Sequence, residues 1–320
     1  MGGGKGSRMQ NDTSLSAPEV LSYFSRLVGA FMRGFAYGCG VVIPVLGVLC
    51  VVSGIAIVFG GATVVDARGQ EESSVRSRFF GLTIPQTDYH IQGVQFTEEC
   101  GDVSVSRGVV STKYCGVSRG IPHMLRRKGF NHMGPPTPVQ NQDFAVPVED
   151  GSYSNPVALF LDVASLATID VLTLHRNKHA PCLALSQSVL AVPEFDGSSM
   201  SVYNLASFGI DSRVWASDWS WDVDIGMELH GIQGCSMLGE TGAIALLSQF
   251  KRSDAANLVI QRVWDGSVIY AATVKPVFFP CEIEGLSWNA DKSEFRFHSI
   301  LAGFFVFEHY ISIPFNWTLQ

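Results

Sequence analysis

The sequence predicts a mainly β fold, a β-sandwich-like extramembrane domain that follows one N-terminal transmembrane helix. Two observations lead to this prediction. One 19-residue apolar run, VVIPVLGVLCVVSGIAIVF, stands out in a chain of 320 residues of which only 16% are charged. Its length is close to the roughly 20 helical residues that cross a bilayer. The rest of the chain contains short runs rich in Val, Ile, Phe and Tyr, bounded by Gly, Pro, Asp or Ser, which is typical of strands.

The membrane helix is predicted over residues 34–65, which contain no charged side chain. Four basic and two acidic residues precede it, so the positive-inside rule places residues 1–33 in the cytoplasm and the C-terminal domain outside. Within 1–33, apolar residues at helical spacing predict a short amphipathic helix, which either lies on the bilayer or begins the membrane helix. The long leader favours an uncleaved signal-anchor over a cleaved signal peptide.

The C-terminal part divides into a charged polar linker over 66–90 and a β-rich extracytoplasmic domain over 91–320. Residues 116–142 are rich in Gly and Pro and have no periodicity, so we expect a long projecting loop. WDGS at 264–267 predicts a hairpin turn between two apolar runs. Only 157–174 is compatible with a helix, and its β-branched residues favour strand there too. No internal repeat is visible.

The stretch WSWDVDIGMELHG, residues 219–231, alternates apolar and polar side chains. Its acidic residues Asp222, Asp224 and Glu228 with His230 could belong to a metal or catalytic site. Next-but-one side chains on a strand lie about 6.7 Å apart, however, whereas ligands must lie within roughly 2–2.6 Å of one metal ion. We therefore predict that the polar row is the solvent face of a strand whose apolar face packs inside the domain.

Five cysteines follow the membrane helix. In an oxidising compartment they predict two disulfides and one further thiol, and in a reducing one they would be five buried thiols. A bridge between Cys100 and Cys115 would close a loop of about 15 residues and stabilise the fold by about 3 kcal/mol. The remaining cysteines are Cys182, Cys235 and Cys281, and their connectivity is open. No pair of these five cysteines has the spacing of metal ligands.

The main basic cluster, Arg126, Arg127 and Lys128, lies inside the predicted loop. Three interpretations stay open: binding of phosphate or an acidic partner, cleavage by a trypsin-like protease, or ordinary solvated charge.

No catalytic, cofactor-binding or metal-binding residue can be assigned, and the sequence favours a non-enzymatic role. The net charge of −7 gives no support for nucleic-acid binding. We predict a membrane-anchored structural or interaction protein whose partners are membrane lipid and other proteins, in a homo- or hetero-oligomeric assembly, a viral envelope or a cell surface. One alternative is an extracytoplasmic hydrolase that uses Asp222, Asp224, His230 and His309. The other is a surface or fusion protein cleaved after Lys128.

Overall fold

The structure is a computed structural model that describes residues 62–66, 71–82, 91–97, 99–106, 108–139, 143–186, 189–196, 199–205, 220–239, 242–249, 255–275, 281–301 and 305–312. Most of the predicted membrane helix, residues 34–61, lies outside these ranges, as do residues 1–33. Its last four residues, 62–65, belong to a strand. Within the described ranges no helix is long and apolar enough to cross a membrane.

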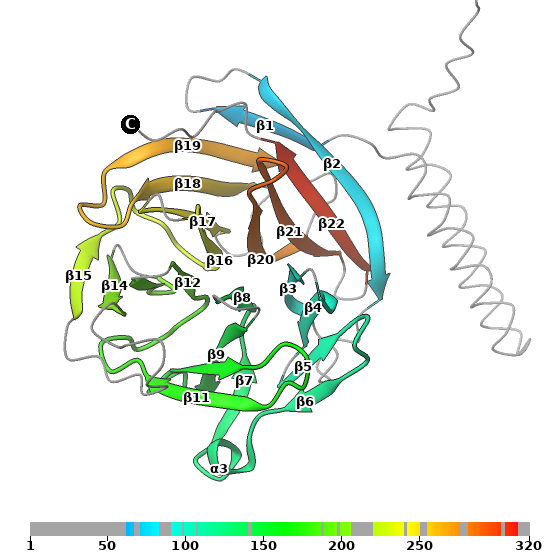
Figure 1. Cartoon of the computed structure of the whole chain (residues 1–320). Helices are drawn as coiled ribbons and strands as arrows, with labels where there is room; N and C mark the ends of the chain where they lie inside the picture. Colours follow the sequence, from blue (N-terminus) through cyan, green and yellow to red (C-terminus); the bar gives the residue numbers. More distant parts are fainter. Residues whose placement is uncertain are drawn as a thin grey trace, which may run out of the picture. The chain divides into compact units, whose positions relative to one another are not determined.

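The described residues form a five-bladed β-propeller (Figure 1). Each blade is an antiparallel sheet. One inner strand of each blade contacts an inner strand of the next, which closes a ring through β3, β8, β12, β16 and β20. The largest hydrogen-bonded sheet has nine strands because β1 joins the outer edges of blades 4 and 5.

Blades 1 to 3 lie consecutively in the chain. Blade 1 has four strands: β3 (Ile91–Thr97), β4 (Gly101–Ser106), β5 (Val109–Thr112) and β6 (Ser118–Gly120). Blade 2 follows the helix α3 (His123–Arg126) with β7 (Phe130–Met133), β8 (Thr137–Pro138), β9 (Phe144–Asp150), β10 (Val157–Leu161) and β11 (Thr168–Thr173). Blade 3 contains β12 (Ala184–Leu185), β13 (Val189–Pro193), β14 (Ser199–Asn204) and β15 (Ser220–Asp224).

Blades 4 and 5 complete the ring. Blade 4 contains β16 (Ile232–Met237), β17 (Ala243–Ser248), β18 (Ala256–Arg262) and β19 (Val268–Lys275). Blade 5 takes three strands from the C-terminal part, β20 (Cys281–Asn289), β21 (Glu294–Leu301) and β22 (Phe305–Ser312). Its outer strand β2 (Glu71–Leu82) comes from the N-terminal part, next to β1 (Ala62–Asp66).

Strand β2 lies in the segment that the sequence assigned to the linker 66–90. Its first eight residues, EESSVRSR, include only one apolar residue, so the segment does not show the composition of a strand. It forms one nonetheless, because its backbone pairs with β22 on one side and β1 on the other. The N-terminal part of the domain therefore closes the ring.

The prediction of a sandwich was wrong, although the mainly β class was right. A sandwich strand turns one face to the core and one to water. In this propeller β10, β13 and β17 are buried at every residue, because a blade packs between two neighbouring blades. The continuous apolar runs VALFL and AIALLS reflect the burial of both faces of these strands.

The segment 116–142 is not a structureless loop. It contains the edge strand β6, the helix α3 and the inner strands β7 and β8. The short elements escape a periodicity search because none is longer than four residues. By contrast, WDGS forms the predicted hairpin turn between β18 and β19, and 157–174 is strand rather than helix.

Two disulfides are confirmed in the described residues. Cys100–Cys115 closes the predicted short loop in blade 1, and Cys182–Cys235 links the segment before β12 to the inner strand β16 of the next blade. Disulfides of this kind are stable in oxidising compartments.

The core lies between the blades. Four apolar clusters fill the contacts of blade 1 with 2, 2 with 3, 3 with 4 and 4 with 5. Near the ring centre the inner strands approach so closely that glycine is needed. Gly285 has φ +66°, and a Cβ there would lie 2.9 Å from the Cα of Gly93 on β3.

Candidate binding site at the rim of blades 1 and 2

The residues of the hydrolase hypothesis do not come together. Asp222 and Asp224 are exposed on β15, as predicted, but this strand ends at Asp224, so Glu228 and His230 are exposed outside it. Asp222 contacts Arg176 at 3.2 Å. His230 is exposed and lies 3.1 Å from the Glu228 carboxylate. His309 is buried in blade 5, where Ser77 and Ser299 hydroxyls bond its two ring nitrogens at 2.7 and 2.6 Å. Burial lowers the pKa of His309 to about 3. In the described part of the chain no three His, Cys, Asp or Glu residues form a metal-binding group.

A second set of charges lies between blade 5 and blade 1. Arg296 Nη1 lies 2.9 Å from Asp102 Oδ1 and 3.3 Å from Glu308 Oε1, and His298 Nε2 lies 3.7 Å from the same Glu308 oxygen. Burial lowers the pKa of His298 and raises that of Glu284, which is also raised by Glu282. These groups are too well enclosed to meet a substrate, so we assign them to the structure of the ring.

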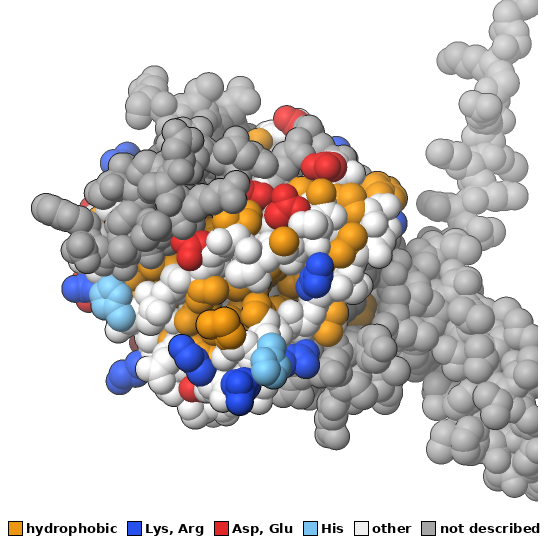
Figure 2. Space-filling model, turned by 60° about the horizontal axis from the view of Figure 1, so that its bottom comes forward, with side chains coloured by type: hydrophobic (Ala, Val, Ile, Leu, Met, Phe, Trp, Pro, Cys, Tyr) orange, Lys and Arg blue, Asp and Glu red, His pale blue; other side chains and the backbone are white. Residues whose placement is uncertain are grey.

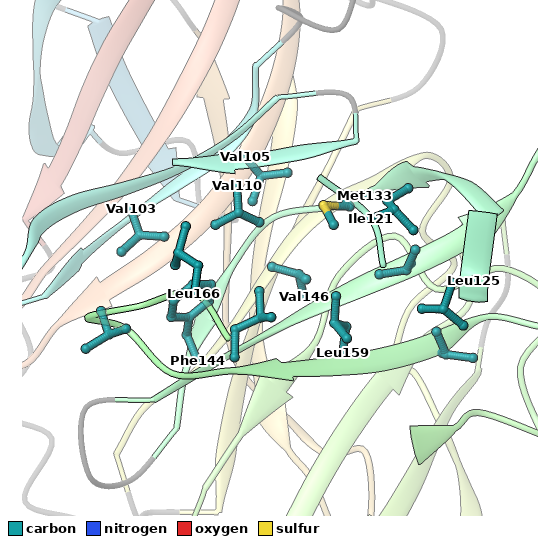
Figure 3. Close-up of a cluster of buried hydrophobic side chains, with 14 of the residues drawn as sticks. Val103, Val105, Val110, Ile121, Leu125, Met133, Phe144, Val146, Leu159 and Leu166 are labelled. Carbon is teal, nitrogen blue, oxygen red and sulfur yellow. The ribbon is translucent and has the colours of Figure 1, made fainter. Parts of the chain in front are cut away.

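The basic cluster, in contrast, lies on the surface. Pro122 begins α3, and its carbonyl accepts hydrogen bonds from the N–H groups of Leu125 and Arg126 at 2.9 and 3.0 Å. Leu125 is buried in the apolar cluster between blades 1 and 2 and anchors the helix there (Figure 3). The opposite side of α3 is exposed and includes Met124, whose exposed fraction of 76% is large for an apolar residue.

A pocket of about 330 Å³ opens beside this helix, between the edge of blade 1 and blade 2. Its wall is mainly aliphatic, with Leu159 and Leu161 from β10 and Leu166 from the following turn. Arg119 on β6 also lines it. Further lining residues are Gly120, Pro122, Met133, Ala167 and Thr168.

Helix and pocket are directly connected. A Cβ on Gly120, a residue of the pocket wall, would lie 2.6 Å from Arg126 Nη2, so the guanidinium lies against this glycine. Arg119 and Arg126 thus place positive charge at the pocket, and the exposed Arg127 and Lys128 extend it just after α3. We call this arrangement the rim site: the pocket with Arg119, Met124, Arg126, Arg127 and Lys128.

The charge around the rim site differs from that of the remaining chain. Residues 103–142 contain six Lys or Arg and no Asp or Glu, whereas residues 34–102 and 143–320 together contain 12 Lys or Arg and 27 Asp or Glu. In Figure 2, Lys, Arg and His side chains gather beside an apolar area in the lower part of the view, and acidic side chains lie mostly above it. Such a local concentration of positive charge attracts acidic segments to this part of the surface.

Sequence reasoning found Arg126, Arg127 and Lys128 but missed the pocket and Arg119. Its walls come from β6, β10 and the turn after β10, which are up to about 50 residues apart in the chain, so no local pattern reveals them. The long acid-free stretch 103–142 was the available signal. Cleavage after Lys128 stays an untested prediction.

Comparisons with known proteins add only fold-level information. No family model matches the sequence, and no curated protein matches it. Among solved structures, the chain is similar to a glutaminyl cyclase from Myxococcus xanthus, at 9% identity over 75% of this chain and 97% of that chain, with a TM-score of 0.49. It is similar to regucalcin, a calcium-binding protein from Agrobacterium tumefaciens, at 10% identity over 69% and 77% of the two chains, with a TM-score of 0.45. It is also similar to a luciferin-regenerating enzyme, at 9% identity over 78% and 90%, with a TM-score of 0.44. Matches this distant carry no information about ligands.

Proposed function

We propose that this protein is a membrane-anchored interaction protein whose β-propeller binds a partner protein outside the cytoplasm through the rim site. One observation carries the proposal: an aliphatic pocket with a basic rim on a chain that is otherwise acidic. The partner segment that fits this site has one apolar side chain for the pocket and acidic residues on either side of it.

The energetics suit a moderate, reversible interaction. Burying one Leu- or Phe-sized side chain contributes about 1.5–3 kcal/mol. Each exposed charge pair at the rim adds about 0.2–1 kcal/mol and is weakened by salt. The apolar side chain therefore supplies most of the affinity, and the arginines supply the preference for acidic segments.

Two features support the placement outside the cytoplasm. The disulfides Cys100–Cys115 and Cys182–Cys235 suit an oxidising compartment. The uncharged run within residues 34–65, preceded by basic residues, suits a signal-anchor.

Binding can be tested with the full chain in detergent and a fluorescein-labelled peptide that carries a central Leu between acidic residues. We expect anisotropy to report saturable binding that weakens with salt. The double charge reversal Arg126→Glu and Arg127→Glu should raise Kd about tenfold or more, because attraction becomes repulsion at the pocket.

The matched control reverses two exposed charges elsewhere, Arg262→Glu on blade 4 and Lys292→Glu on blade 5, and therefore changes the net charge by the same amount. This control should leave Kd within about twofold, since the long-range effect is screened. Equal losses in both double variants would refute a local site. Binding to anionic lipid vesicles but not to the peptide, or self-association of the chain, would assign the rim site to another occupant and overturn the proposal.

The placement is tested separately with a membrane-impermeant thiol reagent added to intact cells. We expect Cys115, which is exposed, to be labelled after reduction and not before it, because it is paired with Cys100. Labelling that requires permeabilised membranes, without reduction, would place the propeller on the inner side.

A further inference from the structure

A second group of side chains lies where the turns of blades 2 and 3 converge. Glu149 near the end of β9 is the cross-strand partner of His132 on β7. Tyr153 comes from the turn after β9, His179 from the connection between the two blades, and Phe195 from the turn after β13. We call these five residues the imidazole cluster. An antiparallel meander brings them together because the second-to-third strand turns and the blade-to-blade connections lie at the same end of the strands.

The central residue of the cluster, His179, is fixed from two sides. Its Nε2 lies 3.1 Å from Oε2 of Glu149, whose side chain is only 1% exposed. The other Glu149 oxygen accepts a hydrogen bond from the N–H of Ala180 at 2.6 Å. The backbone N–H of His179 donates to Glu194 at 3.2 Å, and that of Lys178 donates to the same carboxylate at 3.0 Å. The backbone of His179 is thus held by a carboxylate of blade 3, and its ring lies beside the buried carboxylate of Glu149 in blade 2.

Aromatic rings flank the imidazole. Phe195 stacks on the His179 ring at a centroid distance of 4.7 Å and an interplanar angle of 28°, and Tyr153 lies at 4.8 Å and 42°. Tyr153 has φ +52°, a conformation that costs a bulky residue about 1 kcal/mol or more. Asp150 holds this turn: its Oδ1 accepts the N–H groups of Ser152 and Ser154 at 3.0 and 2.9 Å. The strained turn places the Tyr153 ring beside two imidazoles, because the centroid of the His132 ring also lies 5.7 Å from that of Tyr153.

The cluster is reachable from solvent, unlike the histidines of blade 5. The side chain of His179 is 24% exposed and Tyr153 is 41% exposed, whereas His298 and His309 are at most 1% exposed. An oriented, accessible imidazole backed by a buried carboxylate is the arrangement used for general acid–base catalysis.

We propose that His179 and Glu149 form a general acid–base dyad that hydrolyses small carboxylic esters, with Tyr153 as a hydrogen-bond donor to the substrate. Esters are the substrate class because an imidazole base and one donor suffice for attack by water, and the alcohol leaving group needs a single proton.

The reaction balances without another reagent. The water oxygen forms a bond to the ester carbonyl carbon, and its proton passes to the His179 nitrogen that does not face Glu149. The carbonyl electrons move onto oxygen, which the Tyr153 hydroxyl stabilises by a hydrogen bond. When the carbonyl reforms, the bond to the alkoxy oxygen breaks and that oxygen takes the proton from His179. The products are a carboxylic acid and an alcohol, and Glu149 acts as a positioning residue beside the imidazole.

The test uses the purified full chain with p-nitrophenyl acetate and p-nitrophenyl butyrate, following release of p-nitrophenol. We expect saturable hydrolysis that falls about 100-fold in kcat/KM in His179→Gln. Tyr153→Phe should lower kcat about tenfold with little change in KM. Glu149→Gln should lower kcat and leave KM unchanged, because the imidazole loses the carboxylate that positions it.

His230 provides the matched control, because it also lies 3.1 Å from a carboxylate, that of Glu228, but in an exposed pair. His230→Gln should keep the wild-type rate. If wild-type hydrolysis does not exceed that of His179→Gln, or if both histidine variants lose the same activity, the dyad is refuted. If Glu149→Gln fails to fold, Tyr153→Phe still tests the dyad, because this exposed residue can be changed without disturbing the core. An unchanged kcat in Tyr153→Phe would contradict the proposal.

Discussion

The contact between blades 1 and 2 and the contact between blades 5 and 1 perform the same packing task with opposite chemistry. The first is filled by aliphatic and aromatic side chains, among them Val103, Phe144 and Leu159. The second contains Asp102, Arg296, His298 and Glu308 in a chain of ion-pair contacts. Strand β4 belongs to both, since its valines face blade 2 and its polar residues lie on the other side.

The apolar contact and the charged contact therefore contribute differently to the fold, the first to its stability and the second to its geometry. Apolar packing stabilises a contact but tolerates small shifts, because many arrangements bury similar areas. A buried ion pair contributes little net stability, yet any misplacement leaves a charge without its partner at a cost of several kcal/mol. The polar contact lies where the ring closes, between the first blade in the chain and the blade that β2 completes. It therefore favours one closing arrangement over others.

The largest expected effect comes from removing the central cation. Arg296→Met keeps most of the apolar stem but leaves Glu308, which is fully buried, and Asp102 without their shared partner. We expect a loss of about 3–5 kcal/mol in the free energy of unfolding. Denaturant unfolding followed by tryptophan fluorescence measures it.

The matched change in the apolar contact is Leu159→Ala, for which about 2–5 kcal/mol is expected from the lost burial and the cavity. The two contacts are then distinguished by rescue. Adding Glu308→Gln to Arg296→Met removes the stranded charge and should recover part of the loss. A double variant no more stable than Arg296→Met would contradict the role of the ion pairs.

The sequence allowed prediction of most strands but not of their arrangement. Composition predicted strands in the two apolar runs beside WDGS, LVIQRVW (258–264) and SVIYAATVKPVFF (267–279), and these runs overlap β18 (Ala256–Arg262) and β19 (Val268–Lys275). These patterns are local, whereas the choice between sandwich and propeller depends on which sheets face one another. The structure nevertheless shows a repeated feature. In blades 2 and 4 a register shift near the end of β10 and β18 precedes a turn with the same backbone hydrogen bonds, from Leu166 N–H to the Asp162 carbonyl and from Gly266 N–H to the Arg262 carbonyl.

The candidate sites were less predictable for the same reason. The basic triplet on α3 was visible in the sequence because its members are adjacent. Arg119 and Leu159, by contrast, are 40 residues apart and meet only because neighbouring blades pack side by side. Glu149 lies on a strand of blade 2 and His179 in the connection from blade 2 to blade 3, 30 residues later in the chain. The turn that carries Tyr153 shows no sequence pattern beyond its serines.

The smallest effect concerns Glu284 on the inner strand β20, next to His298 in the sheet register. Burial, assisted by Glu282, raises the pKa of the Glu284 carboxyl well above 4.5. The unfolded chain therefore loses this proton at a lower pH than the folded chain. The stability associated with the protonated form is complete below about pH 4.5 and is lost as the pH rises towards the folded-state pKa.

Glu284→Gln keeps the shape of the neutral acid but cannot ionise. We expect equal Tm values for variant and wild type near pH 4, and a Tm a few degrees higher for the variant at pH 8. The widening gap would show that this inner part of the blade 5–blade 1 contact accepts a neutral polar group and resists a charge, whereas Arg296 and Glu308 require their charges. A Tm difference that is the same at pH 4 and pH 8 would mean that the folded protein accepts the charged Glu284 carboxylate. Glu284 would then belong with Arg296 and Glu308 to the charged part of this contact.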